Sequence, residues 1–245
     1  MTADDWTAGV VDGDEEKAGV DDGDEGKAAG VVDGRAEIDD IDAFLGRLDE
    51  IGTETGCTLQ AFDARYVVDE AHLQRALARA DRARERGTNV ARERGVETLL
   101  YAAGRRQIDD ALQMGVSEGR CPTVVLVAAN GASDGNTSAG NDDASAGNDD
   151  TSAGNDDTSA GNDASAESDA SAADERRKDA RDRQQRAADQ VRALSAFDST
   201  ATVLGAFDAA RLRSFFDVTD RELRATDGDL TDVVHERVAL LDVEK

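Results

Sequence analysis

Several residue types are scarce in this 245-residue chain, and each scarcity excludes a class of protein. The only two cysteines, Cys57 and Cys121, lie far apart and outside any Cys-x-x-Cys spacing, so neither a disulfide framework nor a zinc site is predicted. No basic start followed by an apolar stretch opens the chain, and no run approaches the roughly 18 apolar residues of a spanning helix. We therefore expect a protein of the reducing cytoplasm with no membrane partner.

Groups that carry catalysis are also scarce. The only two histidines, His72 and His235, are isolated in the sequence, and the chain has no GxSxG, HExxH or phosphate-cradling GxxxxGK[ST] motif. Adjacent carboxylates such as Asp109 and Asp110 point apart on a helix, which prevents shared acid or base chemistry. The sequence therefore predicts a protein that is not an enzyme, with no catalytic residue, no metal site and no cofactor.

Lysine is nearly absent, with 4 Lys against 24 Arg, while 54 acidic residues give a formal net charge of −26. An acid excess with little lysine is typical of proteins adapted to high salt, where hydrated carboxylates keep the surface soluble. The Debye length falls to about 3 Å at 1 M salt, so diffuse charge steering is lost there. Recognition by such a protein has to work at contact range.

The negative charge is concentrated in two segments of low complexity. Residues 1–34 contain a degenerate ten-residue repeat and carry −9, and residues 130–174 contain a seven-residue repeat of Ser, Gly, Asn and Asp and carry −11. Neither segment has enough apolar surface to repay the cost of ordering, so a disordered acidic tail and a flexible insertion are predicted. Residues 35–129 and 175–245 carry the remaining −6 and have the length of one domain.

Helices and strands alternate along the predicted domain. Residues 106–115 are expected to form a helix with Ile108, Ala111 and Leu112 facing inward, and residues 200–207 fit either a strand or the start of a helix. This alternation favours an α/β or α+β sandwich, and we predict the α+β class, with helices covering a sheet of about four or five mostly antiparallel strands. The other predicted helices are 37–51, the segment after the cap Asp69, 89–94 and 174–194, and the predicted strands are 57–63, 96–102, 122–129 and 235–243.

Two adjacent arginines follow a run of small residues in the stretch LLYAAGRRQI, residues 99–108. If a buried strand ends at Gly104 and a helix begins next, free amides and two guanidinium groups converge near Arg105 and Arg106 and form an anion site. The alternative is a tight turn whose arginines are simply solvated.

A second arginine-rich stretch lies in the helix predicted after Asp69. Its basic side chains could follow a phosphate backbone, and we include them among the predicted RNA contacts. The alternative is a solvated helix face with local pairs to Asp81 and Glu85. The arginines at i, i+4, i+7 and i+11 are Arg75, Arg79, Arg82 and Arg86.

The C-terminal region carries an aromatic pair and a helix-start signal. Thr219 to Glu222 reads as a capping box, with Leu223 in the position of its hydrophobic staple. Phe215 and Phe216 fit either a core or a partner contact. The surface near Phe215 and Leu223 is the candidate for docking a partner.

Several of these strings together resemble one known family. They are Asn89-Val-Ala91, residues 96–108, Ala111-Leu112 before Gly115, and the C-terminal strings FFDVTDREL and HERVALLDV. Over about residues 55–129 and 197–245 the chain resembles the small kinase-binding accessory subunit of the KEOPS complex. The acidic tail and the heptapeptide insertion depart from the family pattern, as loops of salt-adapted archaeal members would.

The resemblance implies a binding role in tRNA modification. The complex installs threonylcarbamoyl on the adenosine beside the anticodon, and another subunit performs that chemistry. The subunit that this chain resembles docks on the kinase/ATPase subunit and binds the single-stranded 3′ CCA tail of tRNA. The resemblance then implies that Arg105 and Arg106 hold tail phosphates, that Gln107 reads a base edge and that Gly104 lets the backbone approach, with Asn89 as a further contact.

Two other readings stay open. In the second hypothesis the chain is a protein-only regulatory module that stimulates a kinase without binding RNA, and Arg105 and Arg106 pair with acidic residues of the partner. A small enzyme that holds a phosphorylated substrate at the same turn is the third reading, and it lacks a catalytic group.

Overall fold

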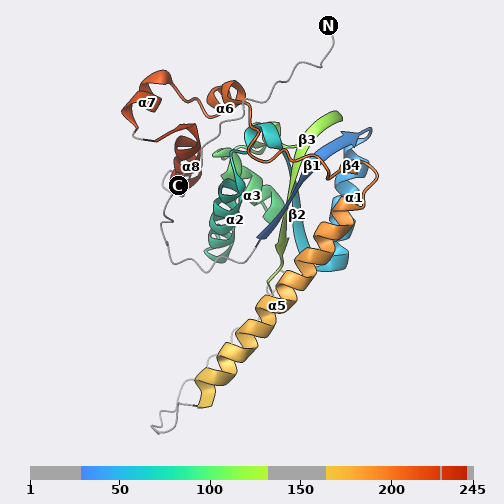
Figure 1. Cartoon of the computed structure of the whole chain (residues 1–245). Coiled ribbons are helices and arrows are strands. Elements are labelled where there is room, and N and C mark those ends of the chain that lie inside the picture. Colours follow the sequence, from blue (N-terminus) through green and yellow to red (C-terminus); the bar gives the residue numbers. More distant parts are fainter. Residues whose placement is uncertain (1–28, 132–163, 227, 242–245) are drawn as a thin grey trace, which may run out of the picture.

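A computed structural model describes residues 29–131, 164–226 and 228–241, and the acidic repeats of 1–28 and 132–163 lie outside this part (Figure 1). Four strands form one sheet in the order β2-β3-β1-β4, and every pair is antiparallel. The predicted α+β class with a single antiparallel sheet is confirmed. The elements are β1 (Ala29–Ile38), α1 (Ile41–Thr55), β2 (Cys57–Asp63), η1 (Ala64–Tyr66), α2 (Glu70–Glu85), α3 (Arg94–Ala103), α4 (Ile108–Ala111), η2 (Leu112–Met114), β3 (Gly119–Ala129), α5 (Ala164–Arg192), β4 (Phe197–Asp198), α6 (Ala209–Phe215), α7 (Asp220–Ala225) and α8 (Leu230–Leu240).

Strand β3 lies inside the sheet and is buried on both faces. Val125 and Val127 pack into one apolar core, and Val124 and Leu126 pack into the other. Successive side chains of a strand point to opposite faces, so a continuous apolar run such as VVLVAA buries itself only if both faces are covered. Helices on both sides of the sheet are the consequence.

One face of the sheet is covered by α1 and α5. Phe44 and Leu48 of α1 and Ala187 and Val191 of α5 are buried against this face. The N-terminal turns of α5 extend well beyond the sheet, as Figure 1 shows. The predicted helix over 174–194 is confirmed in its buried part, but α5 already begins at Ala164, inside the predicted insertion.

The other face is covered by α2 and α3, and α8 packs on these two helices. Leu73 and Leu77 of α2 are buried in this core, and Asp69 caps the helix, as predicted, by accepting a hydrogen bond from the His72 amide. Leu100 of α3 and Val234 of α8 complete this core. The face therefore combines residues from the middle and the end of the chain.

Four sequence predictions about secondary structure are wrong. The tail was predicted to be disordered to residue 34, but β1 begins at Ala29 and pairs with β3 along its length. Residues 89–94 were predicted as a helix, but residues 89–93 form neither helix nor strand and α3 begins at Arg94. Residues 96–102 and 235–243 were predicted as strands, but residues 96–102 lie in α3 and residues 235–240 lie in α8. Nearly every side chain of α3 is buried, so the run has no polar face and loses the helical periodicity that would identify it. Residues 200–207, for which strand and helix both stayed open, form neither.

A buried arginine joins α3 to α2 and to the end of β3. Arg94 forms a two-pronged pair with Asp81, with Nε to Oδ1 at 2.6 Å and Nη2 to Oδ2 at 2.7 Å. Its Nη1 donates to the carbonyl oxygen of Ala129 at 3.1 Å. Since the Arg94 side chain is almost fully buried, its charge depends on these partners.

Replacing Arg94 by Ala removes one partner of this buried pair together with the hydrogen bond to Ala129. We expect a loss of about 3–5 kcal/mol in the free energy of unfolding, measured by urea denaturation. Arg47→Ala, which removes an exposed pair with Glu50, should leave the midpoint nearly unchanged. Equal midpoints for the two variants would contradict the anchoring role of Arg94.

A buried histidine lies where α2, α3 and α8 meet. The Nε2 of His72 lies 2.9 Å from the carbonyl oxygen of Ala102, so Nε2 carries the proton, and the buried Nδ1 has no partner. Burial lowers the pKa of His72 to about 4. The neighbouring His235 of α8 contacts Asp69 through Nε2 at 2.9 Å, and the Asp69 carboxyl has a lowered pKa despite its burial because these hydrogen bonds favour its charged form.

Because the pKa of His72 is about 4 in the fold and near 6.5 in the unfolded chain, the unfolded state binds more protons between these values. Stability should therefore fall as the pH drops from about 6.5 to 4, by about 3 kcal/mol for this group. His72→Gln keeps an N–H that can donate to Ala102, and it should remove this part of the pH dependence. Urea denaturation of both proteins across the window measures the difference, and parallel pH profiles would contradict the assignment.

Candidate functional site

The glycine before the double arginine ends a helix. Gly104 caps α3 in the left-handed region at φ 59°, and its N–H bonds the carbonyls of Leu100 and Tyr101. A Cβ at this position would lie 3.5 Å from Cβ of Arg237 and 3.7 Å from the Phe216 ring. Gly104 is therefore required by the left-handed conformation of the turn, whereas the space beside Arg237 and Phe216 would admit a Cβ at ordinary contact distance.

The predicted strand-to-helix anion site at this turn is wrong in its premise. The segment before Gly104 is a helix, and the helix that follows, α4, has only 4 residues. So few peptide units build almost no macrodipole, and no long helix presents its free amides at this point. Binding of an anion here therefore depends on side chains.

Arg105 is bound to the fold through α6 and the residue that follows it. Its Nη2 donates to the carbonyl oxygen of Phe215 and lies 3.1 Å from Oδ2 of Asp217. The guanidinium carbon lies 5.5 Å from the centre of the Phe215 ring, a cation–π distance. The Arg105 side chain is still 35% exposed. This arginine fixes the C-terminal segment and keeps one open edge.

Arg106 and Gln107 differ from their neighbour because both are exposed. The Arg106 guanidinium makes no hydrogen bond or ion pair with any residue that the structure describes. Gln107 is the N-cap of α4, and its side chain makes no capping bond. The two adjacent arginines therefore have different surroundings, since Arg105 is bonded to the C-terminal segment and Arg106 is exposed with no bond to a described residue.

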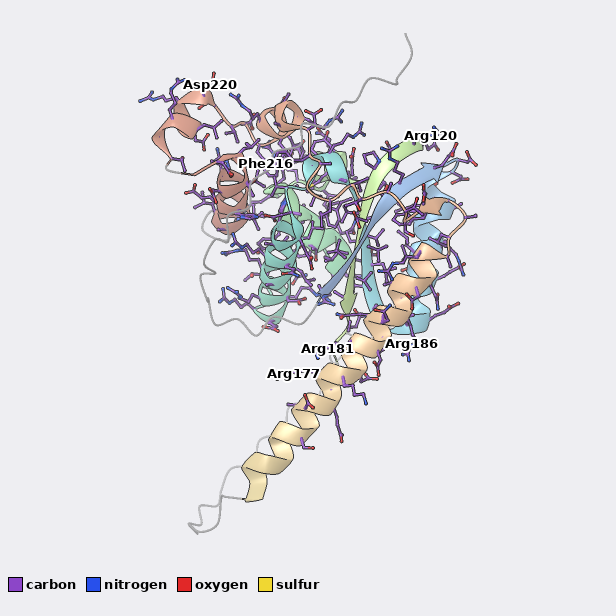
Figure 2. All side chains as sticks on the ribbon, in the orientation of Figure 1. Arg120, Arg177, Arg181, Arg186, Phe216 and Asp220 are labelled. Atoms are coloured by element: carbon purple, nitrogen blue, oxygen red, sulfur yellow. The ribbon has the colours of Figure 1, made fainter. Side chains whose placement is uncertain are left out.

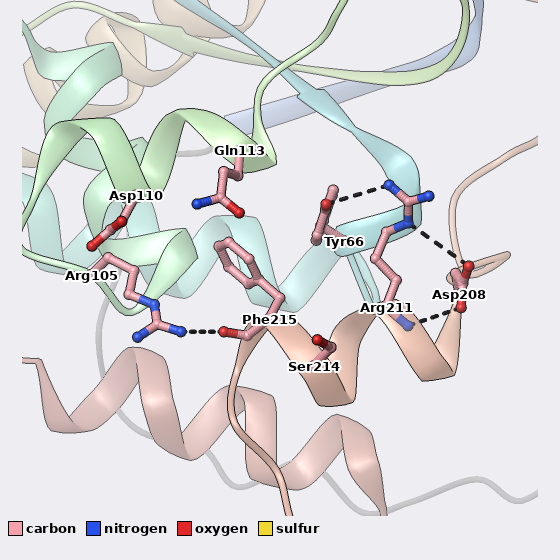
Figure 3. Close-up of a pocket in the computed structure, with 8 residues that line it drawn as sticks. All are labelled: Tyr66, Arg105, Asp110, Gln113, Asp208, Arg211, Ser214 and Phe215. Atoms are coloured by element: carbon pink, nitrogen blue, oxygen red, sulfur yellow. Dashed lines mark hydrogen bonds and ion pairs between the residues drawn. The ribbon is translucent and has the colours of Figure 1, made fainter.

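A polar pocket with a volume of about 560 Å³ lies beside this turn, between α4 with η2 on one side and η1 with α6 on the other (Figure 3). Pockets of 300–1,000 Å³ accept small organic ligands. Its lining residues are Tyr66, Arg105, Asp110, Gln113, Asp208, Arg211, Ser214 and Phe215.

Aromatic rings and guanidinium groups alternate in the wall of this pocket. The Tyr66 and Phe215 rings meet edge to face at 5.0 Å between centroids, and Arg211 lies 5.3 Å from the Tyr66 ring. Nε of Arg211 also lies 3.8 Å from Oδ2 of Asp208, which is a long ion pair. Rings and arginine planes bind flat heterocycles by stacking, and the guanidinium groups bind phosphate. The pocket wall therefore combines two ring surfaces with two guanidinium groups.

Asn89 lies in a turn that a buried carboxylate holds. The Asn89 side chain donates to the carbonyl oxygen of Ala91 at 2.8 Å, and Oε2 of Glu97 accepts from the amides of Val90 and Ala91 at 2.9 and 2.7 Å. The Glu97 side chain is fully buried. Asn89 is thus part of the turn between α2 and α3, and it does not line the pocket.

The arginine stripe of α2 also lies outside the pocket lining. Three of its members are exposed and Arg79 is half-buried, so the face is open to solvent as both readings of the sequence require. Arg79 and Arg82 have interactions within the protein. The stripe consists of Arg75, Arg79, Arg82 and Arg86.

The two residues proposed for partner docking are largely covered. Phe215 is 8% exposed and packs against Tyr66 and Phe216, while Leu223 is half-buried against the same core. Phe215 therefore contributes to the core and to the pocket wall, and it offers little surface to a protein partner.

Most of the pocket was not predicted from the sequence. Asp208 caps α6 by accepting from the Arg211 amide, which is a local signal, but nothing in the sequence places α6 beside η1. Tyr66, Gln113 and Ser214 join the site only through the tertiary fold. Of the residues predicted to bind RNA, only Arg105 lines the pocket, and Phe215, predicted as a partner contact, lines it as well.

The described part of the chain contains neither a membrane-spanning helix nor a metal-binding cluster. No helix in this part of the chain is long and apolar enough to cross a membrane. No group of three or more His, Cys, Asp or Glu side chains in residues 29–131, 164–226 and 228–241 is arranged to hold a metal ion.

The fold and its pocket define a small single-domain α+β protein with the features of a binding module. The family model described as kinase binding protein CGI-121 matches residues 42–242, and the chain belongs to this family. No curated protein matches the chain. The matched range includes every residue of the pocket, the turn and the C-terminal helices.

Arg105→Ala should lower stability, whereas Arg106→Ala should leave it unchanged. Loss of the Arg105 bonds to the segment after α6 should cost about 1–2 kcal/mol, since a partly exposed charged hydrogen bond and a cation–π contact are removed. Arg106→Ala should leave the unfolding midpoint unchanged, because Arg106 has no partner in the described structure. Thermal and urea unfolding of both variants tests this, and a larger loss for Arg106→Ala would refute the assignment.

Proposed function

We propose that this protein is a non-catalytic subunit of an archaeal, salt-adapted KEOPS complex in the cytoplasm. In this proposal it binds the kinase/ATPase subunit and the 3′ CCA tail of tRNA, and so supports the threonylcarbamoyladenosine modification of tRNA. Membership of the CGI-121 kinase-binding family supports the kinase half of the proposal.

The observation that carries the RNA half is the pocket beside a free arginine. A single-stranded tail has unstacked bases, and proteins bind such bases on aromatic rings and arginine planes. The pocket offers the Tyr66 and Phe215 rings with Arg211 and the open edge of Arg105, and the side chains of Gln113 and Ser214 can read a base edge. Arg106, directly beside Arg105 in the turn, is placed to contact a tail phosphate.

This mode of recognition is consistent with the charge of the protein. A chain with a net charge of −26 repels a polyanion at long range, and concentrated salt screens that repulsion. Stacking and short hydrogen bonds act at contact range and remain in salt. A shaped pocket with a few arginines is therefore a better RNA site for this protein than a broad basic surface.

The competing function is a protein-only module that stimulates a kinase. Arg105 supports this reading in part, since its bonds within the fold leave it little freedom to hold a phosphate. Arg106 would then pair an acidic residue of the kinase. Binding of free tRNA separates the two functions.

Purified protein should bind intact tRNA in molar KCl and lose at least about tenfold in affinity when the CCA tail is removed. Arg106→Ala should weaken binding of intact tRNA by about threefold to tenfold, and it should have little effect on the trimmed tRNA. Fluorescence anisotropy with end-labelled tRNA measures all four affinities.

Arg186→Ala is the matched control, because Arg186 is exposed on α5, on another part of the surface (Figure 2). It removes the same charge and should leave both affinities unchanged. If neither tRNA binds, the RNA half of the proposal fails and the protein-only module remains. Equal losses for Arg106→Ala and Arg186→Ala would mean that only overall charge matters.

A further inference from the structure

Two large aliphatic side chains lie exposed on the short segment after the double arginine. Ile108 of α4 is 41% exposed and Leu112 of η2 is 55% exposed. The sequence analysis predicted both as inward, and the structure shows that only Ala111 and Met114 of this segment are buried. Ile108 and Leu112 are four residues apart, so they share one side of the turn.

This pair is unusual among the exposed apolar residues of the protein, because its two members are adjacent. The described part of the chain exposes five large apolar residues, and the other three, Leu45, Val90 and Leu240, lie singly on separate elements. Single exposed apolar residues are ordinary, whereas adjacent ones with a polar rim mark sites of protein contact. In a chain with 33% charged residues, two adjacent exposed aliphatics require an explanation.

We propose that Ile108 and Leu112 are the apolar anchor by which the protein docks on its kinase. This inference rests on the proposed function for the identity of the partner. The Phe215 and Leu223 surface, the earlier candidate, is largely covered, whereas this pair is open. The family to which the chain belongs is a kinase-binding one, so a protein partner is required and a second copy of this chain is not.

Charge and salt define the partner surface further. Asp109 and Asp110 are exposed on the same turn, and neither pairs with a residue that the structure describes. The complementary surface on the kinase is thus an apolar hollow with a basic side chain at its edge. Apolar contact keeps its strength in concentrated salt, where exposed ion pairs are screened, so the aliphatic pair supplies the affinity and the carboxylates supply the orientation.

The same short segment also forms one wall of the pocket. Asp110 and Gln113 line the cavity, while Ile108 and Leu112 of the same segment are not among its lining residues. A kinase docked on Ile108 and Leu112 would therefore contact the segment that also carries two lining residues of the pocket. By linkage, occupation of the pocket and docking of the kinase should change each other's affinity by the same factor.

The test uses the full-length protein and the KEOPS kinase encoded in the same genome, with affinities measured by calorimetry in molar KCl. Leu112→Glu should weaken kinase binding by at least about tenfold, because a carboxylate would enter an apolar contact. Leu45→Glu is the matched control, since Leu45 is 42% exposed on α1 and should change the affinity by less than about twofold. Leu112→Ala, which only removes apolar atoms, should also weaken kinase binding. Because this substitution introduces no charge, a weaker affinity for it would show that the loss does not come from misfolding.

The outcomes separate this inference from the proposed function. If the wild-type protein does not bind the kinase, both fail together. If the wild-type protein binds and Leu112→Glu binds equally well, the docking surface is refuted while the proposed function stands. Loss of tRNA binding with kinase binding intact would assign the pair to RNA and would also overturn the inference.

Discussion

The burial of β3 on both faces is the constraint on which the rest of this structure depends. A strand of consecutive valines cannot leave either face in water, so one helical layer has to form from α1 and α5 and a second from α2 and α3. The second layer needs a helix in residues 94–103, and that helix ends at Gly104. The double arginine thus lies at the end of this layer because the sheet needs a helix there to bury its second face.

From that point the C-terminal residues complete the site. Arg105 binds the carbonyl oxygen of Phe215, and this bond holds α6 against the segment that carries α4. The pocket exists because these two parts of the chain, more than 100 residues apart in sequence, are joined there. Arg105 consequently both stabilises the fold and lines the pocket. The adjacent Arg106 makes no bond within the described structure, so its substitution is the better test of function.

Prediction from sequence succeeded where local signals were sufficient. The caps at Asp69 and Thr219, the alternation in β2 and the apolar run of β3 identified their elements, because each signal involves neighbouring residues. It failed at α3 and α8, where tertiary packing decides which side chains are buried. The same limit explains Ile108 and Leu112, whose spacing fits a buried stripe although the fold leaves them outside. Of the pocket residues, Arg105 and Phe215 belong to strings that the sequence singled out and Asp208 has a local capping signal, whereas Tyr66, Gln113 and Ser214 join the site only through the tertiary fold.

Arg183 ties the middle of α5 to the end of β3. Its Nη1 donates to the carbonyl oxygen of Asn130 at 3.3 Å, so the end of β3 lies beside this point of the helix. The first residue of α5, Ala164, lies 19 residues before Arg183, a distance of about 28 Å along the helix. Each helical turn before Arg183 therefore places the start of α5 about 5.4 Å further from this contact, so the number of turns before Arg183 sets how far the helix projects from the sheet.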